Sequence, residues 1–190
     1  MTDTITVALI YGSARENRFC DTVVDWVLSE LRAMKGFAVV RLDPAELVIS
    51  ARGPDAASVE RIEAVLTAAD AILIVTPEYN HGYPAPLKAI IDSTFKPWHA
   101  KPVAFVSYGG ISGGLRAVEQ LRQVFAELHA VTIRETVSLA HAWALFDSAG
   151  NPFRPAQMNG PLFTMMARLL WWAHTLRRAR SERNYDEAAA

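Results

Sequence analysis

A short polar segment with the composition of an anion-binding loop begins at Gly12, shortly after the apolar run Ile5 to Ile10. Gly12 permits a tight turn, and the Ser13 hydroxyl can donate a hydrogen bond. Arg15 and Arg18 can neutralise a dianion by charge-assisted contacts. The loop has neither the Gly-Lys-Ser or Gly-Lys-Thr ending of a Walker A sequence nor the Gly-x-Gly-x-x-Gly spacing of a dinucleotide fingerprint. It therefore suits a single phosphate, although taken alone it is equally consistent with an ordinary turn that carries surface arginines.

Two further segments add groups that suit a flat ring. The segment Pro77 to Pro84 combines the aromatic Tyr79 with the polar Asn80, and its prolines stiffen the turn. The segment Ser107 to Gly114 contains consecutive glycines, which let backbone amides come close to the edge of a ligand. Taken with the phosphate loop, these segments indicate a planar ring system joined to a phosphate.

The elements that must position these loops follow from the pattern of apolar residues. Five apolar runs rich in Val and Ile predict strands: Ile5 to Ile10, Phe37 to Leu42, Ala71 to Thr76, Val103 to Ser107 and Val131 to Val137. Apolar residues at helical spacing predict the helices: Val23 to Leu31, Ala57 to Ala68, Pro86 to Thr94, Leu115 to Leu128 and Leu162 to Leu176.

Alternating strands and helices of these lengths predict a single α/β domain over residues 1–190. The expected architecture is flavodoxin-like, with a five-stranded parallel sheet in the order 2-1-3-4-5 between two layers of helices. In such a sheet the ligand lies beyond the carboxyl ends of the strands, where the loops after strands one, three and four meet. These are the three loops described above, so we expect them to converge.

Composition limits the partners of the chain. A formal net charge of -1 gives no overall field that would attract nucleic acid or an anionic membrane. The single cysteine, Cys20, excludes an internal disulfide and a multi-cysteine metal site. The first residues lack the pattern of a signal peptide, and the most apolar segment, Pro161 to Thr175, is interrupted by Arg168. We therefore expect a cytoplasmic protein without metal, membrane or nucleic-acid partners, with a frayed tail from about Arg178.

The combination of motifs resembles the NADPH-dependent FMN reductase family, in which a Gly-Ser-x-Arg loop precedes a Pro-Glu-Tyr-Asn segment. The matching tetrapeptides here are Gly12 to Arg15 and Pro77 to Asn80. The resemblance covers roughly residues 5–137 and continues through Gly82, Pro84, Leu87, Lys88, Asp92, Ser107 to Gly110, and Gly113. It implies non-covalent FMN, two-electron chemistry with NADPH or NADH, and a homodimer or homotetramer that builds the site near an interface.

Carried over position by position, the resemblance assigns three groups of residues to FMN. Around the phosphate it places Ser13, Arg15, Arg18, Phe19 and Cys20, with Arg18 and Cys20 standing where Ser and Asn are frequent in relatives. Along the ribityl chain and ring it places Pro77, Glu78, Tyr79, Asn80, His81 and Gly82. At the pyrimidine edge it places Ser107, Tyr108, Gly109 and Gly110.

In this interpretation the flavin carries the hydride, so no catalytic side chain is required. Backbone amides of Ser107 to Gly110 are expected to stabilise negative charge on the ring. Arg15 and Arg18 slightly favour NADPH over NADH, whereas the acceptor, whether flavin, quinone, azo compound or oxidised metal ion, stays open. The alternatives are a flavodoxin-type electron carrier without substrate turnover, and a flavin-free scaffold for another phosphate ligand. The two arginines and the near-neutral charge favour the enzyme over the carrier.

Three other features have less specific interpretations. His81 is the one histidine in a site loop, and the other four are expected on helix faces or in turns. Cys20 is interpreted as a packing residue rather than a redox thiol. The pair Trp171 and Trp172 suits the core, an oligomer contact or a cofactor wall, in that order of preference.

Overall fold

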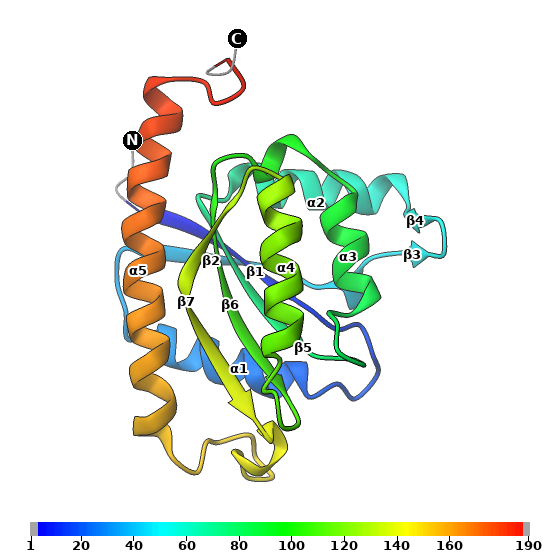
Figure 1. The fold of residues 1–190 in the computed structure, drawn as a ribbon, viewed down its shortest axis with the longest axis vertical. Coiled ribbons are helices and arrows are strands. Elements are labelled where there is room, and N and C mark those ends of the chain that lie inside the picture. Colours follow the sequence, from blue (N-terminus) through cyan, green and yellow to red (C-terminus); the bar gives the residue numbers. More distant parts are fainter. Residues whose placement is uncertain (1–3, 188–190) are drawn as a thin grey trace.

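A parallel sheet forms the central layer of the protein, whose computed structural model describes residues 4–187 (Figure 1). Across the sheet the strands are β2 (Phe37–Leu42), β1 (Ile5–Tyr11), β5 (Ala71–Pro77), β6 (Pro102–Gly109) and β7 (Val131–Ala140). Every neighbouring pair in this sheet is parallel. The predicted flavodoxin-like order is confirmed, and it differs only in numbering because two extra short strands precede β5.

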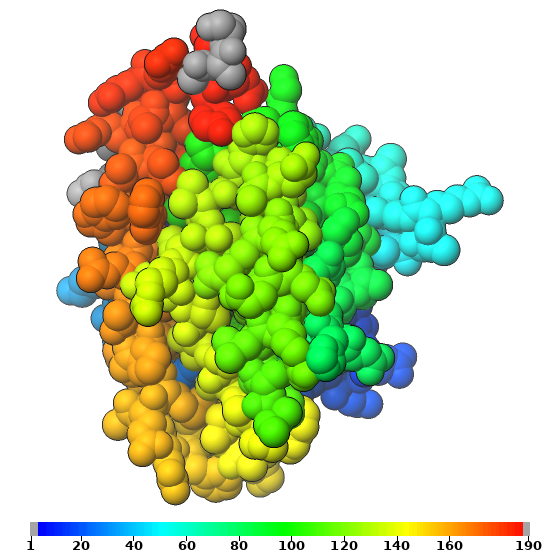
Figure 2. All heavy atoms as spheres, in the orientation of Figure 1, coloured from blue at the N-terminus to red at the C-terminus, as the bar shows by residue number. Residues whose placement is uncertain are grey.

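The two extra strands, β3 (Ile49–Ser50) and β4 (Gly53–Pro54), form an antiparallel hairpin outside the main sheet. The hairpin projects from the surface as the cyan segment in Figure 2. Sequence analysis did not predict it, because strands of two residues are too short to show an alternating pattern.

Helices cover both faces of the sheet, as predicted. One face is covered by α1 (Cys20–Leu31) and α5 (Pro155–Glu182). The other is covered by α2 (Ala56–Ala68), α3 (Ala85–Asp92) and α4 (Leu115–Glu127). Short 3-10 turns lie at η1 (Pro44–Glu46), η2 (Lys96–Trp98) and η3 (Ala142–Ala144).

The core has two halves that meet in the sheet, and β5 contributes to both. Leu73 and Val75 pack towards α1 and α5, whereas Ile72 and Ile74 pack towards the other three helices. Burial of each such side chain stabilises the fold by about 1.5–3 kcal/mol. The absence of alternation in this strand is therefore explained by helices on both sides, and the rigid sheet fixes the loops at its ends.

The carboxyl-terminal helix differs from the expectation of a frayed tail. Helix α5 continues to Glu182. Arg177 donates to the Thr4 carbonyl at 3.0 Å, and Arg180 donates to the Ala100 carbonyl at 2.5 Å. These bonds fasten the helix to the amino end of the sheet, and the helix continues beyond Arg178. Residues 188–190 of the predicted tail, like residues 1–3 at the start, lie outside the described residues.

The tryptophan pair is split between two environments. The Trp171 side chain is exposed, whereas Trp172 packs against the core on the α1 and α5 side. Over residues 4–187, none of the helices combines the length and the apolar character that a membrane crossing requires.

Candidate functional site

The three predicted loops come together at the carboxyl edge of the sheet because β1, β5 and β6 are neighbours. The Gly12 N–H donates to the Val75 carbonyl at 2.7 Å, which continues the pairing of β1 with β5. The loop after β7 joins them, since the His141 N–H donates to the Gly110 carbonyl at 2.9 Å. The convergence of these loops defines the candidate site.

The first loop leaves β1 at a point where only glycine fits. A Cβ atom added at Gly12 would lie 2.6 Å from Thr76 Oγ1 and 2.7 Å from Thr76 Cα. Contacts this short do not occur between real side chains, so the absence of a side chain lets the loop cross close to β5. Gly12 thereby directs the chain over the end of the sheet.

Ser13 is buried and connects the first loop to the second. Its hydroxyl lies 2.8 Å from the hydroxyl of Tyr79, and the Arg15 N–H donates to the same Ser13 oxygen at 3.4 Å. The exposed Arg15 guanidinium lies over the Tyr79 ring, 3.7 Å from its centroid. A cation is therefore stacked on an aromatic face where the first and second loops meet.

The amino end of α1 has no side-chain cap. Its N-cap residue, Phe19, makes none, and the Asp21 N–H donates only to the Arg18 carbonyl, at 3.4 Å. The first N–H groups of a helix have no partner within the helix and carry the positive end of its dipole. The carboxylate of Asp21 in the first turn is paired with Arg18, so this end of α1 can hold a phosphate or another anion.

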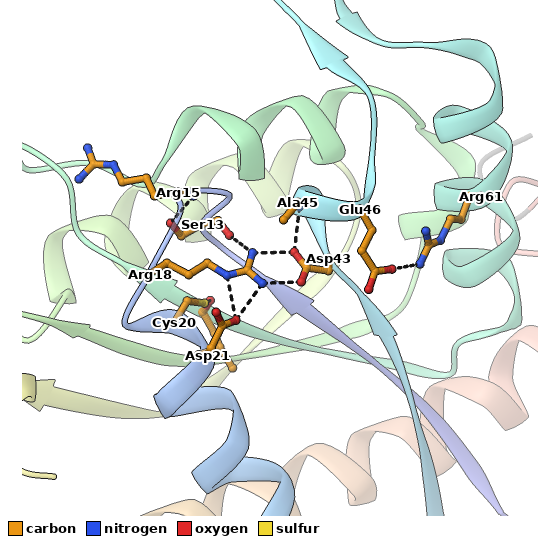
Figure 3. A network of polar contacts seen from close by, with 10 residues as sticks. Ser13, Arg15, Arg18, Cys20, Asp21, Asp43, Ala45, Glu46 and Arg61 are labelled. Carbon is orange, nitrogen blue, oxygen red and sulfur yellow. Dashed lines mark hydrogen bonds and ion pairs between the residues drawn. The ribbon is translucent and has the colours of Figure 1, made fainter. Parts of the chain in front are cut away.

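Arg18, which was predicted to contact a phosphate, has protein partners instead. Its guanidinium donates two hydrogen bonds to Asp43, one of 2.6 Å, and a further bond to the Ser13 carbonyl (Figure 3). Its Nε donates to Asp21 at 2.9 Å. The hydrogen bond with Asp43 raises the pKa of Arg18, although burial acts in the opposite direction. Arg18 thus faces away from the opening and fastens the loop from behind.

Glu78 connects the second loop to the third. Its nearly buried carboxylate accepts from the Ser112 hydroxyl at 2.8 Å, from the Arg116 N–H at 3.1 Å and from Arg116 Nε at 2.6 Å. Burial alone would raise the pKa of Glu78, but the donors from Arg116 and Ser112 outweigh it and the pKa is lowered. Because the N-cap residue of α4, Gly114, has no side chain, Glu78 supplies the cap from a neighbouring loop.

The second loop leaves β5 after Pro77 and forms a tight turn at the site. Tyr79 and Gly82 exchange hydrogen bonds of 2.9 and 3.1 Å, and the two residues between them have positive φ angles of 50° at Asn80 and 74° at His81. Both of these residues are exposed. The turn therefore presents the Asn80 and His81 side chains outward beside Tyr79.

Two residues of α4 hold this turn, and sequence analysis did not identify either. Arg116 Nη1 donates to Nε2 of His81 at 2.5 Å, and Gln120 Nε2 donates to the His81 carbonyl at 2.9 Å. Both lie on the first two turns of the helix, on the side that faces the second loop. Only the packing of α4 beside β5 and β6 brings them there, and their spacing in the sequence carries no signal for it.

The third loop offers its backbone rather than its side chains. The Ser107 hydroxyl is buried and donates to the Gly113 carbonyl at 2.8 Å. Tyr108 is buried, and burial raises the pKa of its phenol well above the usual range. A Cβ atom added at Gly110 would meet nothing within 4 Å, whereas one added at Gly109 would contact Gly114 N at 3.4 Å. The backbone at Gly110 is therefore the part of this loop that a flat ligand can approach.

Phe19 and Cys20 belong to the wall beneath the first loop. The Phe19 ring packs 6.0 Å from the Tyr108 ring, 6.4 Å from Trp143 and 5.7 Å from Phe146, measured between centroids. The Cys20 thiol is buried and donates to the Val75 carbonyl at 3.6 Å. Burial raises the pKa of this thiol, so it stays protonated at neutral pH.

Comparison with known proteins identifies the family of the chain. Residues 5–144 match the sequence profile of a family described as NADPH-dependent FMN reductase. The chain is 33% identical over 129 residues to an NAD(P)H-dependent FMN reductase of Schizosaccharomyces pombe, a match that covers 62% of this chain and 64% of the relative. This match spans less than two thirds of the relative's own length.

Two further comparisons cover more of the chain. It is 32% identical over 159 residues to an NADPH:quinone oxidoreductase of Arabidopsis thaliana, covering 77% of this chain and 81% of the relative. The fold is similar to that of the flavoenzyme NAD(P)H:(acceptor) oxidoreductase FerB from Paracoccus denitrificans, with a TM-score of 0.70 and 22% identity. That alignment covers 90% of this chain and 98% of the solved one.

Proposed function

The chain belongs to the NADPH-dependent FMN reductase family, and on that premise we propose that it binds one FMN and passes hydride from NADPH or NADH to a small oxidised acceptor. The observation that carries the proposal is that the loop before the uncapped amino end of α1 carries the exposed Arg15 and is joined to Tyr79 of the second loop. FMN, when bound, supplies a ring that accepts hydride from a nicotinamide and passes the electrons on.

The residues present fit the phosphate of FMN. The N–H groups at the start of α1 and the Arg15 guanidinium would hold a dianion without further charge from the chain. Ser13 would add its hydroxyl, which Tyr79 already orients at 2.8 Å. Phe19 and Cys20 would contribute packing and backbone rather than side-chain bonds, since the thiol is directed at the Val75 carbonyl.

The residues present also fit a flat ring. The turn from Tyr79 to Gly82 would line one side of it, and the open backbone of Gly110 would approach its edge. The backbone N–H of Gly110 would stabilise negative charge that builds up on the ring, a contribution of about 3 kcal/mol for one well-placed donor. The chain's part in the reaction is therefore to orient two rings and to supply fixed dipoles.

A quinone is the acceptor that the comparisons favour, because the Arabidopsis relative is named an NADPH:quinone oxidoreductase. NADPH is the favoured donor, because the family is described as NADPH-dependent. A homo-oligomer is also part of the proposal, supported by the exposed Trp171. Because the single cysteine is buried and unpaired, we place the reaction in the cytoplasm.

The proposal is tested by mixing the FMN-loaded protein with NADPH or with NADH in the absence of oxygen. We expect either nucleotide to bleach the visible flavin absorbance, with NADPH faster, and an added quinone to restore it over many turnovers. Arg15→Gln should weaken FMN binding about tenfold through the loss of a charge-assisted contact. The matched control is Arg61→Gln, because Arg61 pairs with Glu46 on the surface outside the loop.

Two results would contradict the proposal in different ways. A protein that binds FMN but is bleached by neither nucleotide would be an electron carrier that depends on protein partners. A protein that stays colourless with excess FMN would instead use the crevice for another phosphate ligand.

A further inference from the structure

The Arg18 side chain is buried behind the first loop, with only 7% of its surface exposed. Four hydrogen bonds use its three nitrogens, two to Asp43, one to Asp21 and one to the Ser13 carbonyl. A second contact to Asp21, of 2.8 Å, involves Nη2. A guanidinium has five N–H groups, so little donor capacity is left for a ligand.

The charge around Arg18 also argues against a direct contact with a phosphate. One cation lies between two carboxylates, those of Asp21 and Asp43, so the cluster as a whole is negative at neutral pH. The cluster therefore offers a dianion no net attraction. Figure 3 shows the side chains of Arg15 and Arg18 leaving the loop in different directions, and only Arg18 reaches these carboxylates.

The bond to Ser13 determines which way the loop presents its N–H groups. In a trans peptide the carbonyl of one residue and the N–H of the next point in opposite directions, and the described chain contains no cis peptide bond. Arg18 draws the Ser13 carbonyl towards the interior. The Ala14 N–H of the same peptide unit is therefore turned away from Arg18, towards the open side of the loop.

Asp43 anchors this arrangement to a different part of the fold. It follows β2 directly, its side chain accepts from the Ala45 N–H at 2.9 Å, and it is largely buried. The loop is thus tied to β2 through Arg18 and to the second loop through the Ser13 and Tyr79 hydroxyls. Both connections involve Ser13, because its carbonyl accepts from Arg18 and its hydroxyl bonds to the hydroxyl of Tyr79.

We propose that Arg18 is a positioning residue which, together with Asp43, holds the Ser13 peptide so that the first loop presents its N–H groups to the phosphate, without touching the phosphate itself. This inference rests on the proposed function for the identity of the phosphate as that of FMN. It assigns the direct electrostatic contact to Arg15 and the helix, and it gives Asp43, a negative residue, a supporting role in binding an anion.

Whether Asp43→Asn weakens or strengthens FMN binding distinguishes a positioning role of Arg18 from a direct contact of Arg18 with the phosphate. Removal of a negative charge near a dianion strengthens binding by Coulomb's law, and it would also free Arg18 to reach the phosphate if that were its task. Positioning requires the opposite result, because the neutral side chain holds Arg18 less firmly. We expect Asp43→Asn to weaken FMN binding about tenfold, the loss of a charge-assisted bond.

The experiment measures FMN and riboflavin binding to wild type, Asp43→Asn, Arg18→Met and the double variant by flavin fluorescence quenching. Riboflavin lacks the phosphate, so a general loss of structure weakens both ligands, whereas a misplaced phosphate loop weakens FMN alone. We expect FMN affinity to fall about tenfold in each single variant and by no more than that in the double variant. Both substitutions break the same interaction, that between Arg18 and Asp43. Arg61→Gln is the control and should leave both affinities unchanged.

Three outcomes overturn the inference: tighter FMN binding in Asp43→Asn, additive losses in the double variant, or equal losses for FMN and riboflavin. Amide chemical shifts of the flavin-free protein test the tie independently. Arg18→Met should shift the amide resonances of Ala14 and Arg15, Asp43→Asn should shift them in the same direction, and the core strands should stay unchanged. If wild type binds neither flavin, the proposed function fails while these shifts still decide whether Arg18 holds the loop. Unchanged Ala14 and Arg15 resonances in Arg18→Met overturn the inference whatever the ligand is.

Discussion

Basic side chains gather at both ends of the sheet, and the two ends differ in the partners of these side chains. At the carboxyl end, Arg18 and Arg116 donate mainly to carboxylates that belong to neighbouring loops. At the amino end, Lys101, Arg177 and Arg180 donate to backbone carbonyls, and the two arginines share a single carboxylate, that of Asp70. The first arrangement ties neighbouring loops to one another beside the uncapped amino end of α1. The second arrangement provides hydrogen-bond donors for carbonyl groups at the ends of helices and strands.

The difference shows why a hollow lined with charge is not by itself a site. A cavity of about 340 Å³ at the amino end is lined by residues that include His99, Lys101 and Arg180. Each of these side chains is bound to another part of the chain, as in the hydrogen bond of 2.6 Å between His99 Nδ1 and the Asp186 carboxylate. The carboxyl end is distinguished by an open helix terminus and open backbone at Gly110, which are groups that a ligand can use.

Among the substitutions that test this difference between the two ends of the sheet, the largest loss of stability is expected at Gly12. Gly12→Ala places a Cβ against Thr76, a rigid strand residue, and should destabilise the protein by about 3 kcal/mol. Gly110→Ala is the matched change at open backbone, and it should alter stability by less than about 0.5 kcal/mol while it weakens FMN binding. Urea unfolding and flavin titration measure both quantities. A stable Gly12→Ala variant, or a Gly110→Ala variant with undiminished FMN affinity, would remove the distinction between framework and contact surface in these loops.

A smaller effect, which depends on pH, is expected at the amino end. Burial lowers the pKa of Lys101 to about 8, below the value of about 10.4 in an unfolded chain. Between these values the unfolded chain binds more protons than the folded protein, so stability rises with pH across this window. Lys101→Met has no such group, and wild type should gain on the order of 2 kcal/mol relative to this variant between pH 7 and pH 10. Parallel stability profiles of the two proteins would show that Lys101 is not desolvated and that the amino end is not closed.

The sequence was sufficient for the sheet order and for the convergence of the three loops, because buried parallel strands have a strong local pattern. It was not sufficient for the partners of charged residues. Arg18 resembles a phosphate ligand until Asp43, 25 positions away, is placed beside it. Arg177 and Arg180 resemble a solvated tail until Thr4 and Ala100 supply carbonyls for them. In each case the deciding contact is non-local, and spacing along one element carries no information about it.

The smallest effect is expected at Cys20, which lies at the carboxyl end but belongs to the packed wall. Its buried thiol points at the Val75 carbonyl, and its raised pKa leaves little thiolate to act as a nucleophile. Cys20→Ser keeps a donor in the same place, so the cost is that of burying a hydroxyl, about 1 kcal/mol. Turnover with saturating FMN should stay within about twofold of wild type, because the flavin rather than the thiol carries the electrons. A collapse of turnover in a variant that still binds FMN would make the thiol part of the reaction, and the carboxyl end would then hold a reactive side chain as well as a binding frame.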